Sequence, residues 1–269
     1  MSLDPQSGHC CSDLGCRSRL SAIIVSITWK PEAAQFWKQS KGTAYFADKL
    51  FVTATLAPVD AKQLALQSLT ALPPFCPELR WMLANPMRGQ NRALTLAMTR
   101  LWEQVRTPRV WSMTGFAQHS VGTAILADLI CQETTVDYGQ GAYLGGLLHD
   151  VGKLLLALAV PDTYEYVERF GVCERAVLGW THAELSAEAL RIWNVPERIQ
   201  TAVCQHHEPE LDPTPVAPGQ LPLSYAISAA ERYLHSVGNE RFERFGMDAR
   251  IPRLLKTFEA EFDSVRVLL

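Results

Sequence analysis

Three observations on the sequence predict an all-α fold, a bundle of packed helices. Apolar residues recur at intervals of three and four through most of the chain, as in helices that bury one face. Prolines fall between these periodic segments, where a missing backbone N–H does no harm to a helix. No series of alternating apolar and polar residues predicts a set of strands.

The first part of the chain has the weaker signals. Residues 1–19 are rich in Ser, Gly, Cys and Asp without periodicity, so we interpret them as a disordered or weakly ordered tail. The β-branched stretch 20–29 fits a short strand or part of a helix, because periodicity does not separate the two. Helical spacing then appears in four segments, at residues 31–41, 60–71, 77–83 and 91–105.

The second part has stronger helical signals. Residues 142–160 are apolar on most sides, which predicts one central buried helix stopped by Pro161. Thr181-His-Ala-Glu184 has the capping-box form, in which the hydroxyl and the carboxylate each bind an otherwise unpaired backbone N–H. This box predicts a helix over 182–193. Further helices are expected at residues 116–131, at 196–207, at 221–236 with a stop at Gly238, and at 250–269.

These signals divide the chain into four parts. We expect the tail at 1–19, a mostly helical N-terminal half at 20–110, a helical core at 111–238 and a C-terminal helical extension at 239–269. The core carries most of the chemistry described below. His9, Cys10, Cys11 and Cys16 near the start suggest a metal site, but adjacent cysteines do not have zinc-ligand spacing, so we favour incidental thiols.

Composition excludes several classes of protein. The chain has 269 residues, of which 48% are hydrophobic and 20% charged, as in ordinary globular proteins. Its net charge of −3 provides no general attraction to nucleic acid or to an anionic membrane. Apolar runs are too short for a membrane span, and no secretory signal is visible. We therefore expect a cytoplasmic protein whose seven cysteines are reduced.

Five of the seven histidines, together with one aspartate, fall on four predicted helices at positions able to face one centre. They are His119, His149 with Asp150, His182, and the pair His206 and His207. A buried imidazole needs partners for its ring nitrogens, and a metal ion supplies them to several rings at once. Because imidazole and carboxylate bind Zn, Fe and Mn, the pattern favours a metal centre over unrelated core histidines.

The order of these residues resembles the HD superfamily of metal-dependent phosphohydrolases. Its HDOD branch is similar in finer detail, through Gly-Gly-Leu-Leu-His-Asp-Val-Gly-Lys at 145–153, His-Ala-Glu-Leu-Ser-Ala at 182–187, Trp-Asn-Val-Pro-Glu-Arg-Ile at 193–199 and Gln-His-Ser at 118–120. Leu-Ala-Asn-Pro at 83–86 is more weakly similar to the N-terminal half of HDOD domains. The resemblance covers roughly residues 112–235 and implies a bundle with an HD-like core and an N-terminal helical subdomain.

The resemblance also implies roles for individual residues. The implied metal ligands are His119, His149, Asp150, His182, His206 and His207, the last two matching a pair that serves a second ion in diiron relatives. Asp150 and Lys153 would be the catalytic residues of an active enzyme, in which a metal-activated hydroxide attacks phosphorus. Lys153 would hold a phosphate oxygen, although a snorkelling side chain fits it equally well. The expected cofactor is Fe, Mn or Zn, as one ion rather than two.

Two departures from the HD enzymes predict a partly dismantled site. Their late aspartate ligand falls at Ile227 or Ser228, and the sequence does not favour Glu231, one turn further on, as its replacement. The glutamate that precedes the first histidine in the diiron cyclic-dinucleotide phosphodiesterases falls at Gly115, and their GYP signature is absent. Enough ligands remain for one ion, without the full acidic set.

We therefore predict an HDOD-type module of bacterial signal transduction, with a full or vestigial metal site and with protein partners from a signalling pathway. The alternative is a metal-dependent phosphohydrolase that acts on a nucleotide or cyclic nucleotide, a phosphate-containing small molecule. A structural bundle with core histidines is a third interpretation. The sequence has no P-loop, no nucleophile elbow and no basic-aromatic surface, so we expect neither nucleic acid nor a membrane as a partner.

Overall fold

The computed structural model describes residues 58–72, 75–86, 90–109, 111–171, 173–235 and 250–266. Within these ranges the regular elements are helices, and extended residues pair only in an isolated parallel bridge between Val136 and Leu221. The all-α prediction is confirmed. The expectations for residues 1–19, 20–29 and 31–41, for the N-terminal cysteines and for the stop at Gly238 lie outside the described residues.

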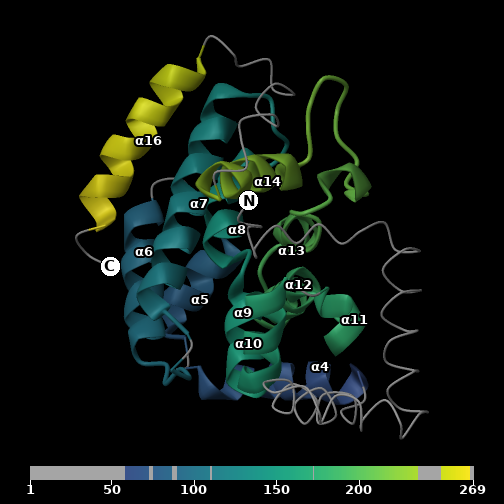
Figure 1. The fold of residues 1–269 in the computed structure, drawn as a ribbon. Coiled ribbons are helices and arrows are strands. Elements are labelled where there is room, and N and C mark those ends of the chain that lie inside the picture. Colours follow the sequence, from purple (N-terminus) through teal and green to yellow (C-terminus); the bar gives the residue numbers. More distant parts are fainter. Residues whose placement is uncertain are drawn as a thin grey trace, which may run out of the picture.

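Helices of the N-terminal half form where three of the segments were predicted. They are α4 (Pro58–Gln67), which continues as a 3-10 turn (Ser68–Ala71), α5 (Pro77–Ala84) and α6 (Asn91–Glu103). α4 packs against α9 and α12, whereas α6 packs against α7 and α8 (Figure 1). The N-terminal half therefore contributes to the same hydrophobic core as the rest of the described chain.

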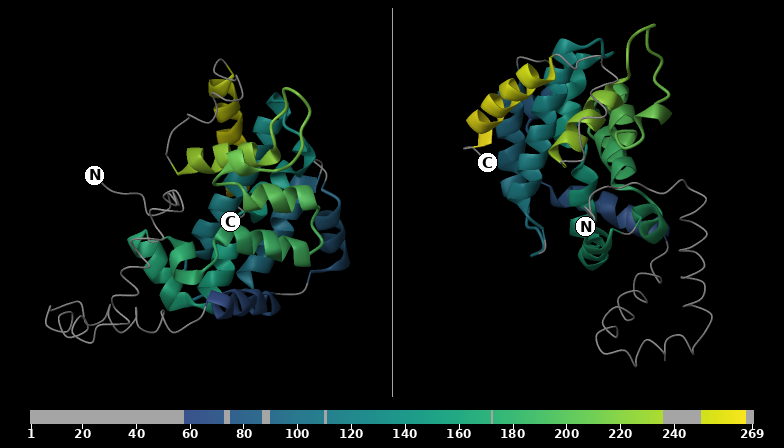
Figure 2. Two further views of the ribbon diagram at one scale, coloured as in Figure 1. Left: turned by 90° about the vertical axis from the view of Figure 1, so that its right-hand side faces the viewer. Right: turned by 45° about the horizontal axis from the view of Figure 1, so that its top comes forward.

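The long helix α7 (Met113–Glu133) is central to the fold, and it carries His119. Besides α6, it packs against α8 (Ala142–Leu148), α14 (Leu223–Leu234) and α16 (Ile251–Arg266) (Figure 2). α16 does so through Leu254, Phe258 and Val265, which bury one face of an otherwise exposed helix. α7 is consequently buried along most of its length.

The single helix predicted over residues 142–160 is wrong, because the structure has two. α8 ends at Leu148 and α9 (Val151–Ala159) begins at Val151, with His149 and Asp150 at the break. Adjacent side chains on one continuous helix point about 100° apart, whereas the break turns both of these toward one centre. The apolar pattern did not reveal the break because both helices are buried on most sides.

The run Gly139–Ala159 is long and apolar enough to cross a membrane, but 89% of it is buried inside the protein. Such a run is expected of helices at the centre of a core. Leu144, Leu147 and Leu154 within it have at most 1% of their surface exposed. Its hydrophobicity is thus accounted for by packing within the described residues.

The remaining predicted ligands lie on or next to the helices that follow α9. α10 (Pro161–Phe170) and α11 (Glu174–Leu178) were not predicted, whereas α12 (His182–Ile192) begins at the predicted capping box. In that box Thr181 Oγ1 accepts from the Glu184 N–H (3.2 Å), and Glu184 Oε2 accepts from the Thr181 N–H (3.0 Å). α13 (Glu197–Cys204) ends before the paired histidines and within the predicted range.

Two glycines allow the helices around the site to approach closely. A Cβ on Gly146 of α8 would lie 2.7 Å from the Cα of Ala124 on α7, closer than real Cβ contacts. A Cβ on Gly152 of α9 would overlap the carbonyl oxygen of His182, and the Gly152 N–H donates to Ser186 Oγ of α12 (2.8 Å). These contacts fix the spacing of α8 against α7 and of α9 against α12.

We expect Gly146→Ala to destabilise the protein by about 1–3 kcal/mol, because the added methyl group meets backbone that has no room to move. Gly115→Ala is the matched control: Gly115 is exposed in the first turn of α7, and its nearest neighbour is the Ser112 side chain. The control should be neutral or stabilising by up to about 1 kcal/mol. Urea unfolding followed by circular dichroism measures both, and equal effects would contradict the close approach.

Candidate metal centre

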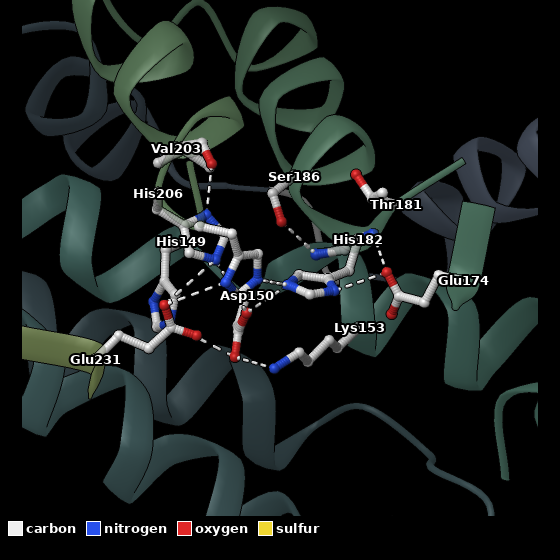
Figure 3. A network of polar contacts seen from close by, with 12 residues as sticks. His149, Asp150, Lys153, Glu174, Thr181, His182, Ser186, Val203, His206 and Glu231 are labelled. Carbon is white, nitrogen blue, oxygen red and sulfur yellow. Dashed lines mark hydrogen bonds and ion pairs between the residues drawn. The ribbon is translucent and has the colours of Figure 1, made fainter. Parts of the chain in front are cut away.

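Asp150 lies at the centre of a cluster of histidines. Its side chain is 2% exposed, and imidazole Nε2 atoms from separate elements surround both carboxylate oxygens (Figure 3). His149 and His119 approach Oδ2, at 3.4 and 3.5 Å. His182 and His206 approach Oδ1, at 3.3 and 4.0 Å. The structure therefore brings five of the six predicted ligands to one point.

The second ring nitrogen of three of these histidines is held by the protein. The Nδ1 atom of His149 lies 2.7 Å from the Gly146 carbonyl oxygen, and that of His206 lies 2.6 Å from the Val203 carbonyl oxygen. The Nδ1 atom of His182 lies 2.8 Å from the Glu174 carboxylate. Carbonyl and carboxylate oxygens only accept, so Nδ1 carries the hydrogen. In a neutral ring of this kind the lone pair lies on Nε2, the atom that faces Asp150.

Burial keeps most of these imidazoles neutral. Removal from water lowers the pKa of His149 to about 3 and that of His119 to about 3, and neighbouring positive groups add to the effect. Burial also lowers the pKa of His206. His182 differs: burial opposes its charge, but the Glu174 carboxylate outweighs that effect and raises its pKa. Neutral imidazole is the form that binds metals.

Asp150 and Lys153 remain charged although both are buried. Burial alone would raise the pKa of Asp150, but His149 and Lys153 outweigh it and hold the pKa well below its usual range, and Lys153 is the one of the two that carries a positive charge while the imidazole is neutral. Burial alone would lower the pKa of Lys153, but Asp150, Glu231 and Glu168 raise it. The Lys153 ammonium lies 2.8 Å from Asp150 Oδ2 and is 8% exposed, so it is an ion-pair partner and not a snorkelling side chain.

His207 and Glu231 close the other side of the cluster. His207 Nε2 lies 2.7 Å from His182 Nε2. Glu231 of α14 is 3% exposed, and its Oε2 atom lies 3.5 Å from His207 Nδ1 and 3.8 Å from His206 Nε2. The sixth predicted ligand is thus present at the cluster, and so is a carboxylate that the sequence did not favour.

Helix geometry explains why Glu231 takes this place. Side chains lean toward the start of their helix, so a glutamate one turn after the expected aspartate reaches back over that turn. Ile227 lies over Gly145 of α8, where a Cβ would come within 2.8 Å of the Ile227 Cδ1. Ser228 is buried in the same turn. The longer side chain of Glu231 therefore supplies the carboxylate from the next turn of α14.

Two further residues of the site were missed by the sequence analysis. Glu174 of α11 accepts from the backbone N–H of His182 (2.7 Å) as well as from its ring. The ring of His235, at the end of α14, lies 4.6 Å from that of His119. No motif marks Glu174, but His235 follows Glu231 by four residues, which places both on one face of a predicted helix.

The residues fit a divalent metal ion. Asp150 Oδ1 and His206 Nε2 lie 4.0 Å apart, and both are buried without a hydrogen-bond partner among the described residues. Buried electron-rich atoms that face one another are costly unless a cation lies between them. Within each of two groups around Asp150 and His182, the potential ligand atoms all lie within 4.8 Å of one another: His182, His206 and His207 form one group, and His149, Asp150, His206 and Glu231 form the other. Imidazole and carboxylate are ligands for Zn, Fe and Mn.

A pocket of about 680 Å³ adjoins the cluster. Its lining includes His119, Asp150 and Lys153 on the side of the cluster. Aromatic rings from Trp111, Phe116 and Tyr164 line it as well. A small molecule in this pocket would touch both the aromatic rings and the charged edge of the cluster.

Comparison with known proteins identifies the domain that contains the cluster. The HDOD domain profile matches residues 88–209. The chain carries an HDOD domain. A crystal structure of an HDOD domain protein with unknown function from Geobacter sulfurreducens shares its fold, with 19% identity, a TM-score of 0.54 and coverage of 78% of this chain and 96% of that chain.

A second solved structure, of a putative signal transduction protein from Marinobacter aquaeolei VT8, is 14% identical with a TM-score of 0.49 and covers 97% of this chain and 66% of that chain. No curated protein matches the chain at a significant level. The HDOD match contains His119, His149 and Asp150, His182 and the paired histidines, but Glu231 and His235 lie beyond its end.

We expect the metal-free protein to lose stability as the pH falls from 7 to 5. Folded His149 stays neutral down to about pH 3, whereas in the unfolded chain it takes up a proton near pH 6.5. The unfolded state therefore binds more protons below pH 6.5, which costs about 2 kcal/mol at pH 5 for this group. His182, with its raised pKa, acts in the opposite direction, but it is one group against four histidines with lowered pKa values.

Urea unfolding of chelator-treated protein at pH 7 and pH 5 measures this effect. A His149→Asn variant is the control, and its stability should depend less on pH than that of the wild type. Equal or greater wild-type stability at pH 5 would show that the imidazoles are not held neutral by burial.

We expect Glu174→Gln to weaken metal binding about 10- to 100-fold, because the variant loses the charge that orients His182 and raises its basicity. Glu197→Gln, on the exposed start of α13, is the matched control and should bind as the wild type does. Competition with a chromophoric zinc chelator gives both affinities. Equal affinities would mean that His182 is not a ligand.

Proposed function

We propose that the chain is an HDOD-type regulatory module of bacterial signal transduction whose core is organised around a divalent metal ion. The observation that carries the proposal is the convergence of four imidazole Nε2 atoms on the Asp150 carboxylate. Three of these rings have Nδ1 committed to protein oxygens, so the atom that each turns toward the cluster is Nε2, and that of His206 has no hydrogen-bond partner among the described residues. The HDOD domain supports the assignment to signalling.

A metal ion in this cluster would connect most of the helices of the core. His119 comes from α7, Asp150 from the α8–α9 break, His182 from α12 and Glu231 from α14. A ligand that binds only the folded arrangement stabilises it, so metal binding is coupled to the packing of these elements. Such coupling suits a module that changes its surface for a protein partner, and we propose the cytoplasm as its location.

Features of the site favour regulation over turnover. His149 and His206 are completely buried, and Lys153 is paired with Asp150. Packed Ile227 and Ser228 lie where HD enzymes have their late aspartate, and the carboxylate at the cluster comes instead from Glu231, which is itself buried. An ion held by His149, Asp150 and His206 would be surrounded by protein on most sides, because these side chains are 0–2% exposed.

The pocket beside the cluster favours a second candidate function, a metal-dependent phosphohydrolase. Lys153 and His119 line this pocket, and a bound divalent ion would supply Lewis-acid chemistry at its edge. Lys153 would hold a phosphate oxygen by its charge. Trp111 and Tyr164 would pack against the base of a nucleotide.

Metal content of the purified protein tests the proposal. We expect about one or more Fe, Mn or Zn ions per chain by elemental mass spectrometry, and a higher melting temperature with metal than after chelation. Asp150→Ala and His149→Ala should lose the metal. Equal melting temperatures with and without metal, and no metal in the wild type, would exclude a metal-organised module.

Turnover separates the two candidate functions. Metal-loaded protein is assayed with bis(p-nitrophenyl) phosphate and with cyclic dinucleotides, and Asp150→Asn is the control. The regulatory proposal predicts no turnover above that of the variant. Hydrolysis that disappears in Asp150→Asn would replace it with the phosphohydrolase.

A further inference from the structure

The end of α14 carries two potential metal ligands that lie outside the matched HDOD domain. Glu231 and His235 are four residues apart, which places them on one face of the helix. Glu231 is buried at the cluster (Figure 3), and the His235 side chain is 15% exposed beside it. Neither residue belongs to the predicted ligand set, so we infer their role from the positions of their side-chain atoms.

The two carboxylate oxygens of Glu231 face different histidines. Oε2 faces His206 (3.8 Å) and His207 (3.5 Å), on the side of Asp150. Oε1 faces His235 Nε2 at 3.9 Å, which is too long for a hydrogen bond. Both Oε1 and His235 Nε2 are buried and have no hydrogen-bond partner among the described residues. A donor and an acceptor so near to each other would normally pair, unless something else occupies the space between them.

His119 completes a third group of ligand atoms. Its ring lies 4.6 Å from that of His235, and the ligand atoms of His119, Glu231 and His235 all lie within 4.8 Å of one another. Ligands about 2.1 Å from a tetrahedral ion are about 3.4 Å apart, so small side-chain movements would bring these three onto one ion. Two imidazoles and one carboxylate form a ligand set used for Zn and for Fe(II), with positions left open.

We propose that His119, Glu231 and His235 hold a second divalent ion, next to one at His149, Asp150 and His206. Glu231 bridges the two, with one oxygen on each ion. This second position rests on the metal centre proposed above and extends it beyond the HDOD match. Glu231 and His235 together take the place of the late aspartate that the sequence lacks.

The two positions differ in their access to solvent. His149, Asp150 and His206 have side chains that are 0–2% exposed, whereas those of His119 and His235 are 17% and 15% exposed. The second ion therefore lies at the edge of the cluster, where water and chelators reach it. We expect it to be removed by a chelator before the inner ion.

Metal stoichiometry of the 269-residue chain tests the proposal. Protein stripped of metal is loaded with Co²⁺ or Zn²⁺, desalted and measured by elemental mass spectrometry. We expect two ions per chain in the wild type and one in His235→Gln and in Glu231→Gln. Glu259→Gln, on the exposed face of α16, is the control and should keep two. Circular dichroism confirms that each variant is folded.

His235→Cys tests direct ligation in a variant with a small side chain at a partly exposed position. If residue 235 binds the ion, the Co²⁺-loaded variant gains a thiolate-to-cobalt charge-transfer band in the near ultraviolet that the wild type lacks. The absence of this band, in protein that holds two ions, would overturn the proposal.

The stoichiometry also separates this inference from the proposed function. One ion in both the wild type and His235→Gln would overturn the second position and leave the metal centre intact. Two ions in His235→Gln would likewise exclude His235 as a ligand. No ion in any protein would overturn both.

Discussion

The buried carboxylate of Asp150 is the constraint on which the rest of the site depends. A charge without water needs compensation from nearby groups, and here Lys153 and four imidazoles surround it. One lysine neutralises one carboxylate, but Glu231 adds a second carboxylate close by. Neutral imidazoles supply lone pairs and no charge, so the cluster as a whole is suited to a cation.

This constraint explains several features of the backbone. The helix breaks between α8 and α9, so that His149 and Asp150 both face the centre. Gly152 then allows α9 to meet the first turn of α12, where the capping box holds His182 in place. A continuous helix or a larger residue at 152 would move one ligand away from the others. The cluster is therefore built by the same contacts that set the helix spacing.

Much of this arrangement could be predicted from the sequence. The helices that carry His119 and His182 have strong local signals, an apolar period and a capping box, so their positions were predicted within a few residues. Local signals also placed the six implied ligands on four elements, and the structure brings them together. These features could be predicted because each depends on residues that are close in sequence.

What the sequence did not reveal depends on contacts between distant elements. The break at His149 leaves no trace in the apolar pattern, because α8 and α9 are both surrounded by core. Glu174 acts only because α11 lies beside the start of α12. Glu231 was not favoured because it lies one turn beyond the position of the HD aspartate in the sequence. Whether a side chain reaches a site depends also on its length and direction. A ligand can thus move by one helical turn without leaving the centre, and the loss of an expected residue does not by itself show that a site is dismantled.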